Sequence, residues 1–243
     1  MKERIDKILV DRGLVSGRER AKALIMEGKV SVNGVKVTKA GAIIDTDSGI
    51  DLKDSDQPYV SRGGLKLEAA LDNFKINPAG MTVMDVGSST GGFTDCMLKR
   101  GASSVYCIDV GYGQLSWSLR NDPRVIVIER TNIRHLEKER ILDSIDIASI
   151  DLSFISLTKV LTKVIEFLGA GGEIVALVKP QFEVGRADVG KGGIVRDEVK
   201  RISAVNSVRD FAEKNGLITI GEFQSPVAGQ KGNIEYFLYM RRA

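Results

Sequence analysis

The chain contains 243 residues, of which 43% are hydrophobic and 28% are charged, as in ordinary soluble globular proteins. These proportions exclude disordered, collagen-like and coiled-coil proteins. The sequence has no run of about 18 apolar residues and no apolar signal core at its charged start, which predicts a cytoplasmic protein without a membrane-spanning helix. Two cysteines and one histidine exclude a disulfide framework and a histidine-rich metal site, so we predict no metal.

Charge is unevenly distributed along the chain. Residues 1–40 contain ten Lys or Arg and five Asp or Glu, whereas residues 41–57 contain one lysine and five aspartates. A basic segment suits contacts with nucleic-acid phosphates. It is equally typical of a solvated helical surface, so charge alone leaves both interpretations open.

The first 57 residues predict two short helices followed by a hairpin. Apolar residues at helical spacing predict a first helix, which Gly13 can end. Ser16 can cap a second helix, which Gly28 can end. Asn33-Gly34 is a strong hairpin signal, because apolar and polar residues alternate on both sides of it.

Segments 4–9, 17–21 and 28–34 resemble the RNA-binding domain of bacterial ribosomal small-subunit protein four and of pseudouridine synthases. The resemblance covers residues 4–52 and implies that this unit grips structured RNA by its shape and its phosphates. Binding of a protein partner is the alternative for so basic a unit. The candidate RNA-binding cations are Arg4, Lys7, Arg18, Arg20, Lys22, Lys29 and Lys36.

We expect the RNA-binding unit to span residues 1–57, followed by an extended linker at 58–62 and a second domain at 63–243. Ser61 can cap the first helix after the linker. Lys66 lies at the edge of the apolar stripe of this helix, where an ordinary surface lysine would be the default interpretation.

From residue 81 onward, strand and helix signals alternate. The predicted strands cover 81–86, 105–108, 125–128, 147–150, 173–178, 217–223 and 234–240. An apolar stripe from Leu157 to Leu168 predicts one helix, and another is expected at 197–214. This order predicts an α/β fold with a Rossmann-like, doubly wound, mostly parallel seven-stranded sheet, and a binding site beyond the carboxyl ends of its strands.

A glycine-rich turn follows the first of these strands. Its sequence, Asp85-Val86-Gly87-Ser88-Ser89-Thr90-Gly91-Gly92-Phe93-Thr94, lacks the G-x-G-x-x-G spacing of dinucleotide-binding enzymes. Asp109 ends the second strand, where a carboxylate can accept both hydroxyls of a ribose. This pattern favours S-adenosylmethionine as the cofactor, and hence a methyltransferase. The candidate cofactor-binding residues are Asp85, Gly87, Ser88, Ser89, Thr90, Gly91, Gly92, Phe93, Thr94, Asp109, Asn132 and Asp151.

The methyl acceptor is less certain from these signals alone. Cys96 falls in a predicted helix and Cys107 within a predicted strand, so neither suits the nucleophile of a cytosine-C5 enzyme. The segment 151–154, Asp-Leu-Ser-Phe, keeps the ends of the motif of amino methyltransferases but lacks its two prolines. Methylation of a base amino group therefore stays open as an alternative.

Four polar residues near predicted strand ends favour a different acceptor. Lys66 precedes the first strand, Asp151 and Lys179 follow the fourth and fifth, and Glu235 lies in the last. Together they suit methylation of a ribose 2′-hydroxyl, because this weakly acidic group needs a base to take its proton. Lys179 is the candidate base, and the two carboxylates would hold the two lysines in place.

Four segments resemble the motifs of FtsJ-like (RrmJ-like) ribose methyltransferases, which carry a Lys-Asp-Lys-Glu tetrad; these segments are 61–67, 150–151, 177–179 and 234–236. With the RNA-binding unit, residues 4–241 resemble the TlyA family, which is named after hemolysin A. This resemblance implies methylation of cytidine 2′-hydroxyls in ribosomal RNA, mainly 23S RNA and additionally 16S RNA, within ribosomal subunits. The loop 190–197 also resembles that family, which adds Lys191 and Arg196, beside Arg62, to the candidate RNA-binding residues.

Two other functions agree less well with the sequence. A pore-forming hemolysin would need a membrane-inserting apolar segment or a many-stranded barrel pattern, and the sequence shows neither. A catalytically inactive ribosome-assembly factor is disfavoured, because all four tetrad residues are present. The sequence leaves the oligomeric state open.

Overall fold

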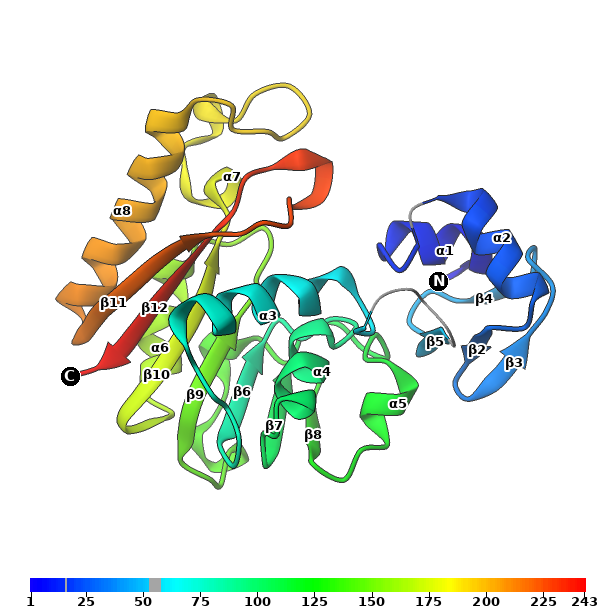
Figure 1. The fold of residues 1–243 in the computed structure, drawn as a ribbon, viewed down its shortest axis with the longest axis horizontal. Coiled ribbons are helices and arrows are strands. Elements are labelled where there is room, and N and C mark those ends of the chain that lie inside the picture. The colour runs from blue at the N-terminus through cyan, green and yellow to red at the C-terminus, as the bar shows by residue number, and fades with distance from the viewer. Residues whose placement is uncertain (16, 53–57) are drawn as a thin grey trace.

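Two folded units make up the computed structural model, which describes residues 1–15, 17–52 and 58–243 (Figure 1). The elements of the N-terminal unit are β1 (Lys2–Arg4), α1 (Ile5–Asp11), α2 (Arg18–Met26), β2 (Val30–Val32), β3 (Val35–Val37), β4 (Ile43–Asp45) and β5 (Ile50–Leu52). Its strands form a β1–β4 pair and a β3–β2–β5 sheet, both antiparallel. The two predicted helices and the hairpin are confirmed, whereas β1, β4 and β5 were not predicted.

Local sequence explains the turns of this unit. Gly13 and Gly28 follow the two helices with φ of +69° and +67°, the left-handed conformation that ends many helices. Asn33 and Gly34 have φ of 49° and 79°, as the two central residues of a tight hairpin require. The predicted cap Ser16 lies outside the described residues.

The C-terminal unit is built around a seven-stranded sheet. Its helices are α3 (Arg62–Phe74), α4 (Gly92–Lys99), α5 (Trp117–Arg120), α6 (Leu161–Ile165), α7 (Pro180–Glu183) and α8 (Glu198–Lys214). Its strands are β6 (Thr82–Val86), β7 (Ser104–Ile108), β8 (Val125–Ile128), β9 (Ile145–Ile150), β10 (Leu168–Val178), β11 (Leu217–Gln224) and β12 (Tyr236–Arg242). The strand order is β11-β12-β10-β9-β6-β7-β8, and β12 runs antiparallel to both of its neighbours while the other pairs are parallel. This confirms the predicted fold.

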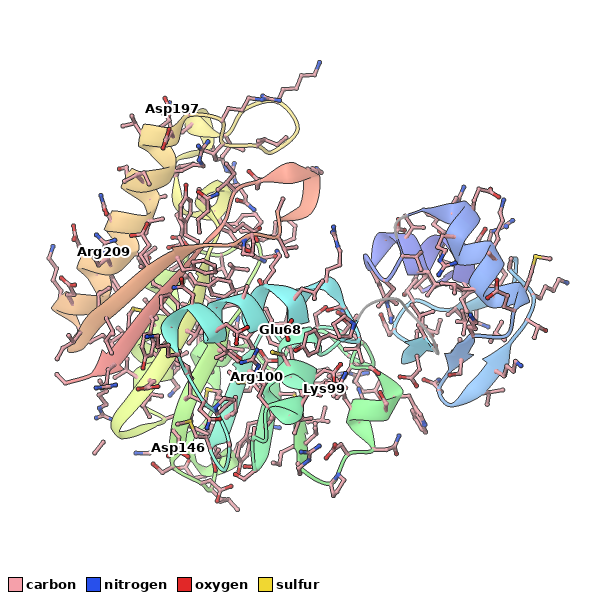
Figure 2. All side chains as sticks on the ribbon, viewed as in Figure 1. Glu68, Lys99, Arg100, Asp146, Asp197 and Arg209 are labelled. Atoms are coloured by element: carbon pink, nitrogen blue, oxygen red, sulfur yellow. The ribbon has the colours of Figure 1, made fainter. Side chains whose placement is uncertain are left out.

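Helices cover both faces of this sheet, so it has two separate apolar cores. α3 and α4 pack on one face, in the core that includes Val83, and α6 and α8 pack on the other, in the core that includes Met84. These two neighbouring residues of β6 point to opposite faces, as the alternation of a strand requires. Arg100 follows α4 and joins it to α3 through Glu68 (3.7 Å) and Asp72 (2.6 Å) (Figure 2).

Two predicted elements of this unit need correction. The helix expected from 157 to 168 is a short 3-10 turn, Leu157–Lys159, followed by α6, and Leu168 already pairs with Ile145 in the sheet. Three of the next four residues are glycines, which disfavour a helix. The second correction concerns Glu235, which lies directly before β12 rather than within it.

The segment predicted as a linker is partly built into the C-terminal unit. The buried Tyr59 packs in the core beneath α3 and donates a hydrogen bond to Glu68 (2.7 Å). The backbone N–H of Val60 donates to Asp95 (2.9 Å). Residues 53–57, which complete the expected boundary, lie outside the described residues.

A polar contact joins the two units at α5. The carboxylate of Asp51, in β5, accepts hydrogen bonds from the hydroxyl of Ser116 and from the backbone N–H of Ser118 (3.1 Å). The loop that carries Ser116 also contacts the glycine-rich turn, because the N–H of Ser116 donates to the carbonyl of Thr90 (3.1 Å). The N-terminal unit is therefore held beside the carboxyl ends of the strands.

Candidate active site

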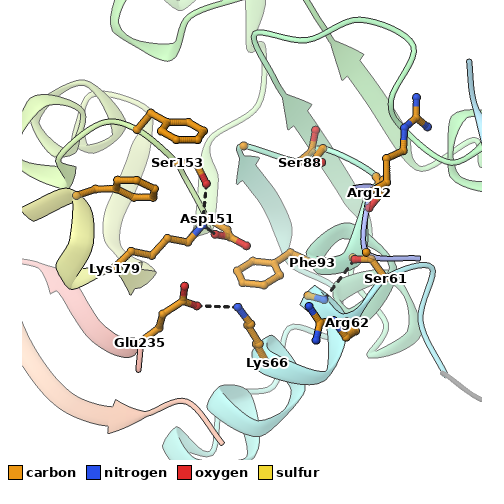
Figure 3. A pocket seen from close by; sticks show the side chains of 18 of the residues that line it. Arg12, Ser61, Arg62, Lys66, Ser88, Phe93, Asp151, Ser153, Lys179 and Glu235 are labelled. Atoms are coloured by element: carbon orange, nitrogen blue, oxygen red, sulfur yellow. Dashed lines mark hydrogen bonds and ion pairs between the residues drawn. The ribbon is translucent and has the colours of Figure 1, made fainter. Parts of the chain in front are cut away.

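The four tetrad residues line one cavity of about 280 Å³ at the carboxyl edge of the sheet (Figure 3). Lys66 comes from α3, Asp151 directly follows β9, Lys179 directly follows β10, and Glu235 directly precedes β12. Four distant parts of the sequence thus meet, because parallel strands end at the same edge of a sheet.

Lys66 and Glu235 form the more deeply buried pair of the cavity. The Lys66 Nζ lies 2.6 Å from Glu235 Oε2, and the Glu235 side chain is 2% exposed. A Cβ on Gly229 would overlap the Glu235 carboxylate, so a larger residue at that position would displace this carboxylate. Such a pair is held firmly, because breaking it would leave a buried charge without a partner.

Lys179 and Asp151 form the second pair, on the facing side of the cavity. The Lys179 Nζ lies 2.6 Å from Asp151 Oδ1 and donates a hydrogen bond to the Ser153 hydroxyl at 3.1 Å. The Asp151 side chain is 24% exposed. Lys179 therefore has a carboxylate on one side and an exchangeable hydroxyl partner on the other.

Two aromatic side chains lie at the same edge. Phe154 is 90% exposed and has a φ of 63°, a rare conformation for a bulky residue. Its ring centroid lies 5.1 Å from that of Phe182 in α7. Both residues line the cavity of the tetrad, so a planar group that enters it meets an aromatic surface.

A second cavity, of about 510 Å³, adjoins the first and shares Gly87, Ser89, Asp151, Ser153 and Phe154 with it. Asp109 lines this second cavity, and its carboxylate accepts hydrogen bonds from the backbone N–H of Ser89 (2.8 Å) and of Gly111 (2.7 Å). These contacts fix the orientation of Asp109, and each carboxylate oxygen keeps a lone pair for a hydroxyl donor.

The chemistry of the second cavity fits S-adenosylmethionine. Apolar side chains that can contact a flat base, including Ile108, Ile133 and Leu152, line the same cavity as Asp109, whose carboxylate can accept ribose hydroxyls. Gly87 has a φ of +87°, and a Cβ there would meet the Asp151 carbonyl. The absence of a side chain at Gly87 thus allows the ends of β6 and β9 to meet beside both cavities.

Nine of the twelve predicted cofactor-binding residues line one of the two cavities; Asp85, Gly91 and Thr94 line neither. Asp85 is fully buried, and its carboxylate accepts hydrogen bonds from Thr94 (2.6 Å) and Ser149 (3.1 Å). Burial raises the pKa of Asp85 to about 7. The hydrogen bond between Asp85 and Thr94 joins the two ends of the glycine-rich turn. Gly91 packs closely against Leu119, which a Cβ at that position would overlap.

The predicted RNA-binding residues lie in two places. Those of the N-terminal unit lie on or next to α1, α2 and the hairpin, and several form ion pairs within it: Arg4–Asp6, Lys7–Glu3, Lys22–Glu19 and Lys29–Glu27. Arg18 and Lys36 are exposed. In the C-terminal unit, Arg62 is exposed at the cavity of the tetrad, and Lys191 and Arg196 are exposed on the loop before α8.

Several site residues were not predicted as such. Arg12 and Gly13 line the cavity of the tetrad although they belong to the N-terminal unit. Gln114 lines the second cavity; the glycines at positions 111 and 113, shortly before it, were a usable signal in the sequence. Ser153 lies beside Lys179 through a contact between two loops, for which sequence spacing carries no signal.

The described residues also bear on the other predictions. Cys96 and Cys107 are buried, free thiols, as predicted. Among residues 1–15, 17–52 and 58–243, no cluster of His, Cys, Asp and Glu could hold a metal ion. No helix in the described part of the chain is long and apolar enough to cross a lipid bilayer.

Comparison with known proteins assigns each unit to a family. A sequence model of the FtsJ-like methyltransferases matches residues 59–242, and a model of the S4 domain matches residues 3–50. The fold of the first family implies the use of S-adenosylmethionine. A solved S-adenosylmethionine-dependent methyltransferase from Mesorhizobium loti, 16% identical, covers 72% of this chain and 96% of its own with a TM-score of 0.55, which shows a shared fold.

Relatives that span the whole chain are more informative. The 16S/23S rRNA (cytidine-2′-O)-methyltransferase TlyA of Mycobacterium tuberculosis is 48% identical over 98% of this chain and 89% of its own. A solved structure described as "Putative hemolysin from Streptococcus thermophilus" is 43% identical, covers 100% of this chain and 89% of its own, and has a TM-score of 0.80. The chain therefore belongs to the TlyA family of rRNA methyltransferases, in which an S4 domain precedes an FtsJ-like methyltransferase domain.

Proposed function

We propose that this protein transfers a methyl group from S-adenosylmethionine to the 2′-hydroxyl of a cytidine in ribosomal RNA. The observation that carries the proposal is the pair of lysine–carboxylate contacts that face each other across one cavity, beside a cavity suited to the cofactor. The mycobacterial relative, by its name, acts on cytidine 2′-hydroxyls of 16S and 23S rRNA. We take 23S RNA as the main substrate and 16S RNA as a further one.

Lys179 is the residue we assign to the hydroxyl. When bound, S-adenosylmethionine supplies a methyl group on a positively charged sulfur. The form of Lys179 that lacks its proton accepts the proton of the 2′-hydroxyl, and Asp151, 2.6 Å away, stabilises the ammonium that results. A ribose hydroxyl would take the place of Ser153, which occupies the other side of the Lys179 nitrogen at 3.1 Å.

The other residues of the cavity position the substrate. Lys66 and Glu235 fix the wall that faces Lys179. If either side chain moved away, the other charge would stay buried without a partner. Phe154 and Phe182 present aromatic faces on which the base of the target nucleotide can stack. Much of the rate comes from holding the hydroxyl close to the methyl group.

The N-terminal domain brings the RNA to this cavity. Its basic helix α2 and its hairpin supply phosphate contacts, and its residues Arg12 and Gly13 form part of the cavity wall. An RNA bound to both domains is thereby held across the site. We retain 1–57, 58–62 and 63–243 as the proposed division into RNA-binding domain, linker and methyltransferase domain. Ribosomal subunits as substrates place the enzyme in the cytoplasm.

The test is a transfer of labelled methyl from S-adenosylmethionine to purified large and small ribosomal subunits, followed by digestion to nucleosides. We expect labelled 2′-O-methylcytidine from the large subunit, and a smaller amount from the small subunit. The matched control is an RNA with 2′-deoxycytidine at the mapped position, which should accept no methyl group.

A methyl group on the base, or undiminished transfer to the deoxycytidine substrate, would contradict the proposal. Either result would favour the alternative that segment 151–154 belongs to a methyltransferase of base amino groups. Absence of any transfer, with intact binding of the cofactor and of both subunits, would instead favour the inactive assembly factor.

A further inference from the structure

Two loop segments of the site are joined at both of their ends. At the near end, Lys179 contacts Asp151 (2.6 Å) and Ser153 (3.1 Å). At the far end, Glu183 Oε2 accepts a hydrogen bond from the hydroxyl of Ser156 at 2.5 Å. Glu183 Oε1 also accepts a hydrogen bond from a backbone N–H, that of Leu157, at 2.9 Å. The segment after β9 and the segment after β10 are therefore joined near both of their ends.

Glu183 is the last residue of α7, four positions after Lys179. α7 has only four residues, too few for a helix that is stable by itself. The helix must therefore be held by its surroundings, and the two hydrogen bonds to Glu183 do this. The Glu183 side chain is half-buried, and burial raises the pKa of its carboxyl; its two donors compensate part of that burial.

Phe154 and Phe182 lie between these two ends, with their rings in contact. Phe154 is exposed and holds a positive φ, a conformation that persists only where neighbouring contacts impose it. Ser156, two residues later, is fixed by Glu183. Loss of that contact would let the segment after β9 relax, and would move Phe154 away from Phe182 and Lys179.

We propose that Glu183 is a positioning residue for methyl transfer: it holds the segments 151–157 and 179–183 together, and so sets the geometry of Lys179 and of the Phe154–Phe182 pair. This inference rests on the proposed function. Glu183 does not line either cavity, so its effect passes through other residues.

The experiment compares Glu183→Ala with Glu183→Gln on ribosomal subunits. The alanine variant should lower kcat by between about tenfold and a hundredfold, the loss that small displacements in a site produce, while the Kd of S-adenosylmethionine stays unchanged. Glutamine keeps an oxygen for the Leu157 N–H and an amide that can donate to the Ser156 hydroxyl, so it should restore most of kcat. Glu166→Ala is the matched control, since Glu166 directly follows the short helix α6 and is an exposed glutamate that pairs with Lys163 (2.7 Å).

A second variant tests the same contact from the other side. Ser156→Ala should lower kcat by a smaller factor, and the double variant Glu183→Ala/Ser156→Ala should be no worse than Glu183→Ala alone, because both remove one shared contact. If Glu183→Ala does not fold, Ser156→Ala carries the test.

Three outcomes would overturn the inference. They are an unchanged kcat in Glu183→Ala or, where that variant does not fold, in Ser156→Ala; independent, multiplying effects of the two substitutions; and a weaker Kd of S-adenosylmethionine that accounts for the whole loss. Failure of the proposed function would look different, since the wild-type protein itself would then yield no 2′-O-methylcytidine.

Discussion

The two lysine–carboxylate pairs of the active site have the same separation but different surroundings. In each pair the lysine nitrogen lies 2.6 Å from a carboxylate oxygen. The Glu235 side chain is almost completely buried, whereas about a quarter of the Asp151 side chain is exposed. Lys179 also has the hydroxyl of Ser153 as a neighbour. One side of the cavity is closed, and the other can admit a further partner.

This difference indicates a division of labour between the pairs. Two buried charges that have no alternative partner keep their geometry through a reaction, which suits a cavity wall that positions the substrate. A pair at the edge of solvent can exchange one hydrogen-bond partner for another, which suits the group that handles a proton. The same residue types thus serve two purposes, and their burial decides which.

The largest expected effect is that of Lys179→Ala, which removes the proposed base. We expect kcat for methyl transfer to fall by about 10²- to 10⁴-fold, with unchanged binding of S-adenosylmethionine, measured by single-turnover transfer and by calorimetry. Lys163→Ala is the control, because Lys163 pairs with Glu166 on the surface of α6. A greater loss of kcat in Lys66→Ala, with that variant still folded, would reverse the roles assigned to the two lysines.

The second prediction concerns the stability of the two pairs. Glu235→Ala leaves the Lys66 ammonium buried without its partner and should lower the free energy of unfolding by about 3–5 kcal/mol. Asp151→Ala should lower it by less, because the Lys179 ammonium, although its side chain is as little exposed (12%) as that of Lys66 (11%), keeps the Ser153 hydroxyl as a hydrogen-bond partner at 3.1 Å. Urea unfolding of both variants measures the difference. Glu235→Gln, which keeps a hydrogen-bond acceptor, should lose less than Glu235→Ala; equal losses for Glu235→Ala and Asp151→Ala would contradict the comparison.

The third prediction uses a buried carboxylate that is held by hydroxyls instead of a lysine. Burial raises the pKa of Asp85 from 3.8 to about 7, so between about pH 4 and pH 7 the folded protein binds a proton that the unfolded chain lacks. The contribution of Asp85 to stability therefore falls as pH rises through that window. Asp85→Asn should remove this loss, which amounts to about 4 kcal/mol at most.

Unfolding by urea at pH 5 and at pH 8 tests this sign. The stability of Asp85→Asn relative to the wild type should rise between the two pH values. A difference that stays constant would show that Asp85 is ionised throughout this pH range, which would contradict the prediction. The control is Asp146→Asn, because Asp146 accepts a hydrogen bond from the N–H of Thr82 at the opposite edge of the sheet.

The fold was predictable where the local pattern of apolar and polar residues matches the strands of the sheet. Apolar runs that end in a polar residue marked five parallel strands, and the order of strands and helices implied the edge at which the tetrad residues meet. The segment 157–168 was predicted as one helix, but it holds a 3-10 turn, the short helix α6 and the start of β10, because helical spacing does not mark where a short helix gives way to a strand. The pairing of Leu168 with Ile145 shows that the strand has begun at that residue.

The site was predictable to a lesser extent, and for a physical reason. Residues at strand ends share an edge by topology, so Asp151 and Lys179 could be placed together. Ser153 and Glu183 act through contacts between two loops, and loop geometry has no period in the sequence. The cavity wall formed by Arg12 depends on how two domains meet, which motifs within each domain do not encode.

The substitution with the smallest expected effect tests whether the difference between the two lysine–carboxylate pairs depends on the methyltransferase domain alone. Asp51→Ala removes the acceptor of hydrogen bonds from Ser116 and Ser118, which loosens the RNA-binding domain. We expect the KM for ribosomal subunits to rise at least about fivefold, because two hydrogen bonds of about 0.5 kcal/mol or more each are lost, with an unchanged kcat. Asp11→Ala, at an exposed position on α1, is the control. If kcat falls in parallel with the rise in KM, the wall at Arg12 shapes the reacting geometry, and the difference between the two pairs is a property of both domains together.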